Sequence, residues 1–514
     1  MSGALLAANQ APITITFNEI PFGIQVPGVY TEIAPNYDQS GLVGYQAAAL
    51  LMIPVLSTGT LAPLTPTQVF TVTQGSALAG PGGIGDAMIR AFINANPFSP
   101  LFAMSLVTPG GATAASWQVQ AQYTASLSQN GYAALYVNGK SYAVACTVGV
   151  DSGNTTVTNL LNAINADPLC PVIASNATGG YVTLTARDKG TIGNQIDVRY
   201  NLNPQDSVPA GLTESVAKTA GTGVHGVAAA FAAIPTFPAT DIVCPWNDSA
   251  STAALQTELD RRFGAMVEYD ACGWGAFSET TFTPLLADTS GLNSRFASYL
   301  GAQNMPSPVY LLAATYGAVA SYYLLQDPAR QLQTLVLPGI VAPQTLDILI
   351  ETERQSQLVG GQATFVVNRD GTVRIERAIS TYQYSAGNVP DASYRDIMTA
   401  KILQRIRYDW RNYVRMVYPR NKMTADGSLA AEYDPNIVTP RRMASAWASR
   451  CKLYEQLGWI QNSKATAAAS IFQLDVNNPN QMDARQQLQI MNNLMVLAGR
   501  IEFNVATPQV GALG

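Results

Sequence analysis

The N-terminal region combines short alternating runs of apolar and polar residues with prolines. Residues 12–33 read PITITFNEIPFGIQVPGVYTEI, two extended runs that Pro21 and Pro27 interrupt. Because proline has no backbone N–H to donate, it is tolerated at a sheet edge and not in a central strand. The pattern therefore favours an edge strand or a separate arm.

Buried strands and a helix alternate over the next stretch of chain. Continuous apolar runs at 48–57 and 101–108 predict buried strands, and 68–73 predicts a further strand. Between them, 86–94 has the spacing of a helix, entered through the glycine-rich turn AGPGGIG. Strands separated by a helix indicate an α/β layer.

From about 118 to 202 the composition shifts to Thr, Gly, Asn and Val with a period of two. Asn138-Gly139 stands between two alternating runs, a strong signal for a β-hairpin. Residues 158–167 predict one short helix, and 179–200 predict two further strands. We therefore predict a compact β-rich insertion between two halves of the α/β domain.

The α/β pattern resumes from about 223 to 350. Residues 240–246 predict a buried strand, 254–266 a helix, and 308–326 a second helix rich in Ala and Tyr. Prolines lead into this second helix and follow it, as expected at the two ends of a helix.

The closing part of the chain predicts an α+β domain. Two alternating runs meet at 369–371, Arg-Asp-Gly, which indicates a hairpin. A long helix that stops at Pro419 has one apolar stripe at three- and four-residue spacing, which we predict to be buried. The stripe consists of Ile402, Ile406, Trp410, Tyr413, Val414 and Val417.

A second helix and two strands follow. Thr439 and Pro440 predict an N-cap and first turn, and the helix runs to about Leu457. Residues 470–476 and 493–506 predict late strands.

Together these elements predict a multidomain α/β and α+β chain. At 514 residues it is well past the roughly 250–300 at which single cores stop growing. The predicted parts are an N-terminal arm and linker (1–45), an α/β domain in two parts (46–117 and 205–360), a β-rich insertion (118–204), and a closing α+β domain with a C-terminal arm strand (361–514).

Composition points to surface buried between copies. Hydrophobic residues make up 47% of the chain and charged residues 12%, about half the usual share of roughly 25%. No window offers the ~18 uncharged apolar residues that a membrane span needs. We expect such a chain to bury extra surface against copies of itself, and a large monomer with a big core is the alternative.

Candidate catalytic chemistry is sparse. The single histidine, His225, lies in a glycine-rich turn and is predicted to be an ordinary loop residue. The N-terminus lacks the pattern of a secretory signal, and no C-x-x-C pair occurs, so we expect free, buried thiols made in a reducing cytoplasm. We predict no metal, no cofactor and no enzymatic activity. The five cysteines are Cys146, Cys170, Cys244, Cys272 and Cys451.

Residues 80–85 satisfy the pattern G-x-G-x-x-G in front of a helix. A dinucleotide site also needs an acidic residue about 20 positions on, at the end of the next strand, and that strand ends in Thr108-Pro109. We therefore predict a structural turn. The pattern G-x-x-x-x-G-K-[ST] of a phosphate-binding loop is missing from the sequence.

Positive charge is concentrated between residues 394 and 422. Eight basic residues against Asp396 and Asp409 give +6 there, so the other residues of the chain, with 21 basic and 32 acidic, sum to −11. A cationic helix on an acidic chain favours a binding surface. Nucleic acid is an alternative partner, but nearby aromatics lie on the predicted buried stripe and the pI of about 5.1 opposes it. The basic residues are Arg395, Lys401, Arg405, Arg407, Arg411, Arg415, Arg420 and Lys422.

Seven motifs occur in one order across most of the chain. They are VPGVYTEI (26–33), GPGGIGDAMIRAFINANPF (80–98), LLAATYGAVASYYLLQDPARQLQTLVLPGI (311–340), NRDGTVRIERAISTYQ (368–383), SYRDIMT (393–399), VYPRNKM (417–423) and NIVTP (436–440). No single motif is diagnostic, but the collinear set resembles the contractile tail sheath proteins of Mu-like bacteriophages. The turn at 80–85 is longer than the F-G-x-G-S turn expected of the family, and the insertion resembles the outward decorations of such sheaths.

This resemblance implies a structural subunit. Sheath subunits of the family stack as hexameric rings around a tail tube, and contraction drives the tube through the host envelope. Extended terminal arms add strands to the sheet of a neighbour's inner domain, which is here the closing α+β domain. The implied partners are further copies, the tail tube protein, and the baseplate and tail terminator proteins, with no nucleic acid and no stable membrane insertion. The implied location is the virion, after assembly in the host cytoplasm.

The resemblance also implies roles for residues. Alternatives stay open: the arms could be strands of the protein's own sheet, and the basic helix could be a solvated face or an intersubunit contact. A non-contractile virion shell or baseplate-type protein sharing the inner domain is the rival function. The implied inter-subunit arm residues are Ile13, Ile15, Phe17, Val26, Val29, Ile33, Ile501, Phe503 and Val505, and the implied tube contacts are Lys401, Arg405, Arg407, Arg411 and Arg415.

Overall fold

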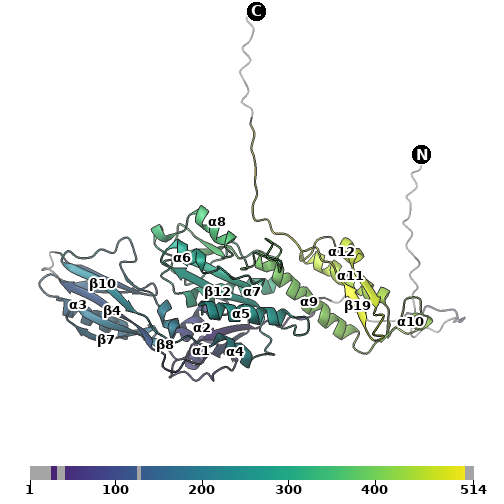
Figure 1. The fold of residues 1–514 in the computed structure, drawn as a ribbon, viewed down its shortest axis with the longest axis horizontal. Coiled ribbons are helices and arrows are strands. Elements are labelled where there is room, and N and C mark those ends of the chain that lie inside the picture. Colours follow the sequence, from purple (N-terminus) through teal and green to yellow (C-terminus); the bar gives the residue numbers. More distant parts are fainter. Residues whose placement is uncertain (1–24, 32–40, 124–128, 504–514) are drawn as a thin grey trace, which may run out of the picture.

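The computed structural model describes residues 25–31, 41–123 and 129–503, and its three parts lie in a row (Figure 1). The insertion forms one end, the α/β middle domain lies in the centre, and the closing domain forms the other end. Helix α9 (Ile397–Val417) leads from the middle domain into the closing domain. The chain is therefore a mixed α/β protein with several separate sheets.

The middle domain is built on a six-stranded sheet in the order β13–β12–β11–β1–β3–β2. All neighbouring pairs are parallel except that of β2, which lies antiparallel at one edge. Strand β1 is buried at every position, as its continuous apolar run predicts. The strands are β1 (Ala49–Ile53), β2 (Thr67–Val69), β3 (Leu101–Ser105), β11 (Asp241–Val243), β12 (Cys272–Glu279) and β13 (Ala297–Gln303).

Helices cover both faces of this sheet. On β12, a Cβ at Gly273 would meet Leu255 and Leu259 of α5, whereas the next residue, Trp274, packs edge-on against Tyr316 of α7. Because successive strand residues point to opposite faces, α5 and α7 lie on opposite sides. The helices are α1 (Val72–Ala79), α2 (Ile84–Ala95), α4 (Val227–Ala233), α5 (Ser249–Phe263), α6 (Phe282–Ala287), α7 (Val309–Gln326) and α8 (Glu351–Val359).

The strand predicted at 68–73 is shorter than expected. Strand β2 ends at Val69, because the Thr71 side chain accepts a hydrogen bond from the backbone N–H of Gln74 and so caps helix α1.

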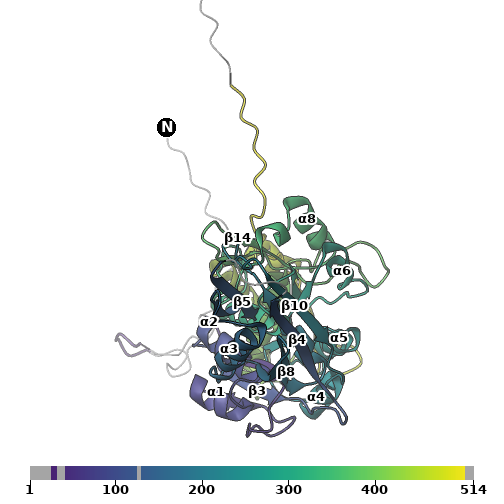
Figure 2. The same cartoon turned by 90° about the vertical axis from the view of Figure 1, so that its left-hand side faces the viewer.

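The insertion is wider than the predicted 118–204. Strand β10 (Leu212–Thr219) pairs along its whole length with β4 (Ala114–Tyr123), so both belong to the insertion. Its two sheets have the orders β10–β4–β8–β7 and β6–β5–β9, with α3 beside them (Figure 2). The hairpin at Asn138-Gly139 is confirmed. The other elements are β5 (Gly131–Val137), β6 (Lys140–Cys146), α3 (Gly153–Asn165), β7 (Val172–Thr178), β8 (Tyr181–Lys189) and β9 (Val198–Tyr200).

The hairpin predicted at 369–371 forms as β14 (Thr364–Val367) and β15 (Val373–Arg377), but it packs with the middle domain. Ala363 donates its N–H to the carbonyl of Tyr299 at 2.9 Å, which attaches the hairpin beside β13. The main hydrophobic core continues through this hairpin as far as Ala400. The closing domain therefore begins within α9 and not at residue 361.

The closing domain is a small α+β unit. Helix α11 (Pro440–Gln456) starts at the predicted cap, where the Thr439 hydroxyl accepts from the N–H of Arg442. The hairpin of β18 (Ile471–Leu474) and β19 (Met482–Arg485) confirms the first late strand. Residues 491–503 contain no strand, in contrast to the prediction for 493–506. The other elements are β16 (Lys422–Met423), α10 (Leu429–Tyr433), β17 (Ile437–Val438) and α12 (Ser463–Ala469).

The glycine-rich turn at 80–85 attaches the insertion to the middle domain. Asp188 of β8 accepts a hydrogen bond from the N–H of Ile84, at the start of α2, at 2.7 Å. Gly82 has a φ of +75°, and a Cβ there would lie 2.3 Å from the carbonyl oxygen of Pro168. The turn therefore needs glycine because the insertion approaches it closely, and its helix N-terminus holds a carboxylate of the same chain.

Asp188 makes the docking of the insertion sensitive to pH. Burial raises its pKa from 3.8 to about 6, more than the Ile84 N–H and Arg187 lower it. A raised carboxyl pKa contributes stability below pH 3.8 that is lost as pH rises through about 6. We expect Asp188→Asn, which keeps an oxygen for Ile84, to be more stable than the unmodified chain at pH 7, by up to about 3 kcal/mol, and no more stable at pH 4.

Urea unfolding at both pH values measures this difference. Asp260→Asn, at an exposed carboxyl group, serves as the control and is expected to leave the difference near zero. An Asp188→Asn chain that is less stable at pH 7 would contradict the assignment.

Candidate functional site: the joint on helix α9 and the exposed ends

Helix α9 carries the cations that the sequence singles out, and most of them face the protein itself. Lys401 is 6% exposed, and the side chains of Arg405, Arg407 and Arg411 are half-buried. Of the five implied tube contacts, Arg415 alone is exposed.

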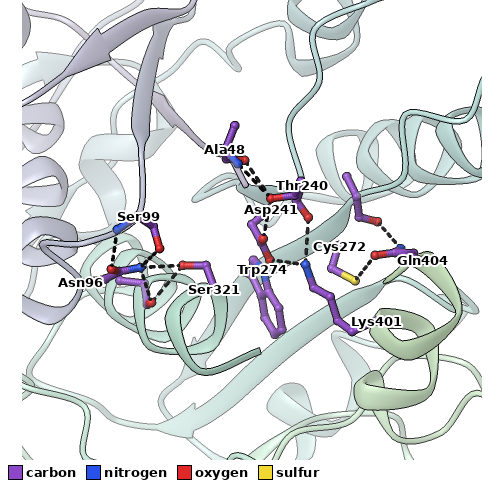
Figure 3. A network of polar contacts seen from close by, with 12 residues as sticks. Ala48, Asn96, Ser99, Thr240, Asp241, Cys272, Trp274, Ser321, Lys401 and Gln404 are labelled. Carbon is purple, nitrogen blue, oxygen red and sulfur yellow. Dashed lines mark hydrogen bonds and ion pairs between the residues drawn. The ribbon is translucent and has the colours of Figure 1, made fainter. Parts of the chain in front are cut away.

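Lys401 lies in a buried polar network between α9 and the sheet (Figure 3). Its Nζ donates to Asp241 Oδ1 at 2.7 Å and to the carbonyl of Thr240 at 2.9 Å. The same Oδ1 accepts from Trp274 Nε1 at 2.8 Å, and Thr240 Oγ1 lies 3.0 Å from Asp241 Oδ2. Burial alone lowers the pKa of Lys401, but the charge of Asp241 opposes this and the resulting pKa is raised, so the ammonium form is held. The prediction that Lys401 contacts a tube is wrong, because its charge is used to neutralise a buried carboxylate.

Next along the helix, two arginines bind the loop that leads into β12. Arg407 Nε donates to Asp270 Oδ2 at 2.9 Å, and its guanidinium lies over the ring of Phe263 at 4.1 Å. Arg411 Nη1 donates to Glu268 Oε2 at 2.7 Å and to its carbonyl at 3.0 Å. These charges therefore serve intramolecular pairs, which corrects the interpretation of a single cationic face.

Arg405 and Asp409 contact the residues that precede β1. The Arg405 guanidinium lies 3.9 Å from the ring centre of Tyr45. Asp409 is buried, and its Oδ2 accepts from Arg450 Nη2 at 2.5 Å and from the Tyr454 hydroxyl at 2.6 Å. Its Oδ1 accepts from the N–H of Val43 at 2.8 Å. Helix α9 thus joins the middle domain, the closing domain and the N-terminal linker.

The far end of the closing domain is the most exposed part of the same unit. Leu429 and Tyr433 of α10 are 71% and 84% exposed, and Met416 near the end of α9 is 54% exposed. Arg415 and Arg420 are exposed beside them. We call residues 415–434 the tip; it lies opposite the insertion along the molecule (Figure 1).

The C-terminal segment presents apolar side chains to solvent. In Figure 1 it leaves the closing domain and extends away from the body. Ile501 and Phe503 are 93% and 81% exposed, and Leu494, Val496 and Leu497 are exposed as well. Val26 and Val29 of the N-terminal region are also exposed. Ile13, Ile15, Phe17, Ile33 and Val505 lie outside the described residues.

His225 differs from the loop residue that its turn predicts. It is 1% exposed and packs against the ring of Trp246, with 5.2 Å between ring centres. Burial lowers its pKa to about 4, so the ring is neutral at physiological pH. The sequence offered no signal for this packing, because it depends on Trp246, which follows β11 and is separated from His225 by helix α4.

The cysteines and the possible metal ligands were also singled out by the sequence. All five cysteines are free and buried, as predicted. In the part of the chain that the structure describes, no three His, Cys, Asp or Glu side chains gather in an arrangement that could hold a metal ion. Every helix among the described residues is too short or too polar to span a membrane.

The middle domain defines a class of protein. Residues 220–381 match the sequence model of the phage tail sheath protein central domain. The match begins directly after β10, where the insertion ends, and it includes the hairpin of β14 and β15. This segment of the chain is therefore similar to the central domain of phage tail sheath proteins.

The particular relatives agree with this class. The chain is 28% identical over 493 residues to the Mu-like prophage FluMu tail sheath protein of Haemophilus influenzae, covering 96% of this chain and 100% of the relative. The predicted resemblance to tail sheath proteins of Mu-like phages is confirmed.

Two solved structures are also similar over most of the chain. The sheath tail protein of Desulfitobacterium hafniense has a TM-score of 0.48 at 11% identity, covering 90% of this chain and 100% of that one. The sheath of an extracellular contractile injection system, PVC, in its contracted state, has a TM-score of 0.49 at 10% identity, covering 94% and 98%.

The joint on α9 predicts a large cost for losing Lys401. We expect Lys401→Met to lower the free energy of unfolding by about 3–5 kcal/mol, because it leaves Asp241 buried without its counter-ion. Adding Asp241→Asn to Lys401→Met should recover much of this loss, since the amide keeps the acceptor for Trp274. Urea unfolding followed by tryptophan fluorescence measures both.

Arg415→Met on the same helix is the control, and we expect a change within about 0.5 kcal/mol because this side chain is exposed. Equal losses at Lys401 and Arg415 would contradict the buried role of Lys401.

Proposed function

We propose that this protein is the structural subunit of a contractile phage tail sheath. It polymerises as stacked hexameric rings around a tail tube, and contraction drives the tube through the host envelope. The observation that carries the proposal is the 28% identity to a tail sheath protein over 96% of the chain, with the sheath central domain at 220–381. The baseplate and tail terminator proteins are its further partners, and the virion is its location.

Electron microscopy of the purified protein tests this function. Long tubular polymers with two states that differ in pitch and diameter are expected of a contractile sheath. Polymers of a single pitch under all conditions would favour a non-contractile shell, and a chain that stays monomeric at high concentration would exclude both.

Terminal segments link neighbouring subunits by adding strands to the closing domain, which is the inner domain of the assembly. Support comes from the exposed apolar C-terminal segment with Ile501 and Phe503. The hairpin of β18 and β19 also supports it, because this sheet has only two strands among the described residues and two-stranded sheets are marginal alone. An added strand would complete main-chain hydrogen bonds at such an edge.

The tip, in place of the middle of α9, faces the tail tube. It lies at the end of the molecule opposite the insertion, so a subunit that turns its insertion outward turns the tip inward (Figure 1). The tip holds three basic and three acidic residues, and Arg441 and Arg442, which follow it, bring the net charge of residues 415–442 to +2 in an acidic chain. Exposed apolar side chains beside these cations suit a partner with both acidic and apolar groups.

The C-terminal link predicts the effect of a truncation. We expect a chain that ends at Asn492, which keeps Ile490 and Met491 on the closing domain, to fold as a monomer and to lose polymerisation, because the exposed segment that follows adds little to either core. Sedimentation measures assembly, and circular dichroism with thermal unfolding measures the fold. Ile501→Ser with Phe503→Ser is the milder variant, and Lys464→Ser on the closing domain is its control; unfolding of the truncated monomer would contradict the proposal.

The basic residues of the tip predict that charge reversal there weakens assembly on the tail tube. We expect Arg415→Glu, Arg420→Glu and Lys422→Glu together to weaken tube-templated assembly about tenfold or more, since each exposed ion pair contributes about 0–1 kcal/mol. Tube-free polymerisation should be unchanged. Reversal of three exposed cations elsewhere, Lys189, Arg330 and Arg369, is the control; equal effects of the two triples would contradict a local contact.

A further inference from the structure

The residues just before β1 are held on the closing domain although they lead into the middle domain. We call residues 41–48 the strap. Leu42 packs against the core of the closing domain, which includes Ile402 and Tyr454. At its other end the strap enters β1, where Ala48 exchanges hydrogen bonds with Thr240.

Four polar contacts fix the first half of the strap to α9 and α11. Asp409 Oδ1 accepts from the N–H of Val43 at 2.8 Å, and Arg450 Nη1 donates to the carbonyl of Gly41 at 3.2 Å. The Tyr408 hydroxyl donates to the carbonyl of Gly44 at 3.2 Å, and the Arg405 guanidinium lies over the ring of Tyr45. The strap is therefore bound through the backbone of Gly41, Val43 and Gly44 and through the ring of Tyr45.

Asp409 organises this attachment. It is 1% exposed, and its other oxygen accepts from Arg450 and Tyr454, which lie on α11. Hydrogen bonds to an ionised group in a buried site are stronger than neutral ones, and Asp409 is such a site. One carboxylate thus ties the strap to two helices of the closing domain at once.

Strand β1 is the first strand of the middle sheet along the chain, so it is the strand that tension on the N-terminal arm would reach first. It lies between β11 and β3, so both edges of it carry ladder hydrogen bonds of the middle domain. Without the strap contacts, a pull on the chain before residue 49 would act directly on Ala49, the first residue of β1. With the strap attached, the same pull acts on α9 and α11.

We propose that Asp409 is a positioning residue that anchors the strap, so that load applied to the N-terminal arm by a neighbouring subunit passes into the closing domain and bypasses β1. The inference rests on the proposed function, which supplies the neighbour and the load. Within the subunit, the anchor and the recipient hairpin of β18 and β19 then belong to the same domain. Tension between copies runs from closing domain to closing domain, and the middle sheet is left unloaded.

Stretching a single full-length molecule by its two ends tests the anchor without any polymer. In the unmodified chain, rupture of the anchor frees the eight strap residues before β1 is loaded, and we expect a first step of at most about 28 Å, their fully extended length at ~3.5 Å per residue. In Val43→Pro, which removes the N–H that Asp409 accepts, this step is lost. Gly44→Ala is the control, because a Cβ there meets nothing within 4 Å, and it should keep the step.

A second variant, Leu42→Ala, decides the test if the Val43→Pro variant does not fold. Leu42→Ala leaves the backbone hydrogen bonds and removes part of the apolar cover, so the first step should remain and occur at lower force. An unchanged first step in both variants, or no such step in the unmodified chain, overturns the inference.

Assembly separates this inference from the proposed function. If the chain polymerises, Val43→Pro polymers should fall apart at lower urea concentration than Gly44→Ala polymers, while the thermal unfolding of the two monomers agrees. Equal urea resistance of the two polymers overturns the load path. If the unmodified chain forms no polymer, the proposed function fails, and the stretching experiment alone decides the anchor.

Discussion

The buried pair of Lys401 and Asp241 determines how the two domains of this protein meet. Asp241 opens β11, in the interior of the middle sheet, where a carboxylate without a counter-ion would cost several kcal/mol. Its cation comes from α9, about 160 residues later. This pair holds α9 against the sheet, because moving the helix away would leave the charges of Lys401 and Asp241 without their partners. Hydrophobic packing alone would allow α9 to slide, but a point charge with a hydrogen-bonded partner specifies one position.

Helix α9 consequently belongs to two hydrophobic cores. Along α9, the residues of the middle domain's core end at Ala400, and those of the closing domain's core begin at Ile402. Helix α9 is thus shared by the two domains. Farther along it, Arg407 and Arg411 add two ion pairs to the middle domain. A subunit joined in this way transmits a force on its closing domain to its middle domain through α9. The strap, by contrast, contributes only the partly buried Leu42 to the core of the closing domain, so its release leaves the fully buried residues of that core in place.

The sequence predicted the elements whose signals are local. The hairpin at Asn138-Gly139, the cap at Thr439 and the buried β1 were all found, because a turn type, a cap or an apolar run depends on a few adjacent residues. The excess charge of α9 was counted correctly but assigned to the wrong partner. Glu268, Asp270 and Asp241 lie on segments far away in sequence, and no periodicity of the helix reveals them. For the same reason the burial of His225 and the reach of β10 were missed, since both depend on long-range packing.

The glycine-rich turn at 80–85 has a local pattern that can either bind a ligand or join two parts of one chain. In nucleotide-binding folds such a turn leaves a helix N-terminus open to a phosphate. Here the helix start at Ile84 is already bound by the carboxylate of Asp188, and Gly82 lets Pro168 come into contact. An anion from another molecule would have to displace a side chain that the insertion holds in place. The attraction between a helix N-terminus and an anion, which binds cofactors in other folds, thus joins the insertion to the middle domain in this chain. The buried ion pairs of α9 have the same role, because they fix one part of the chain relative to another.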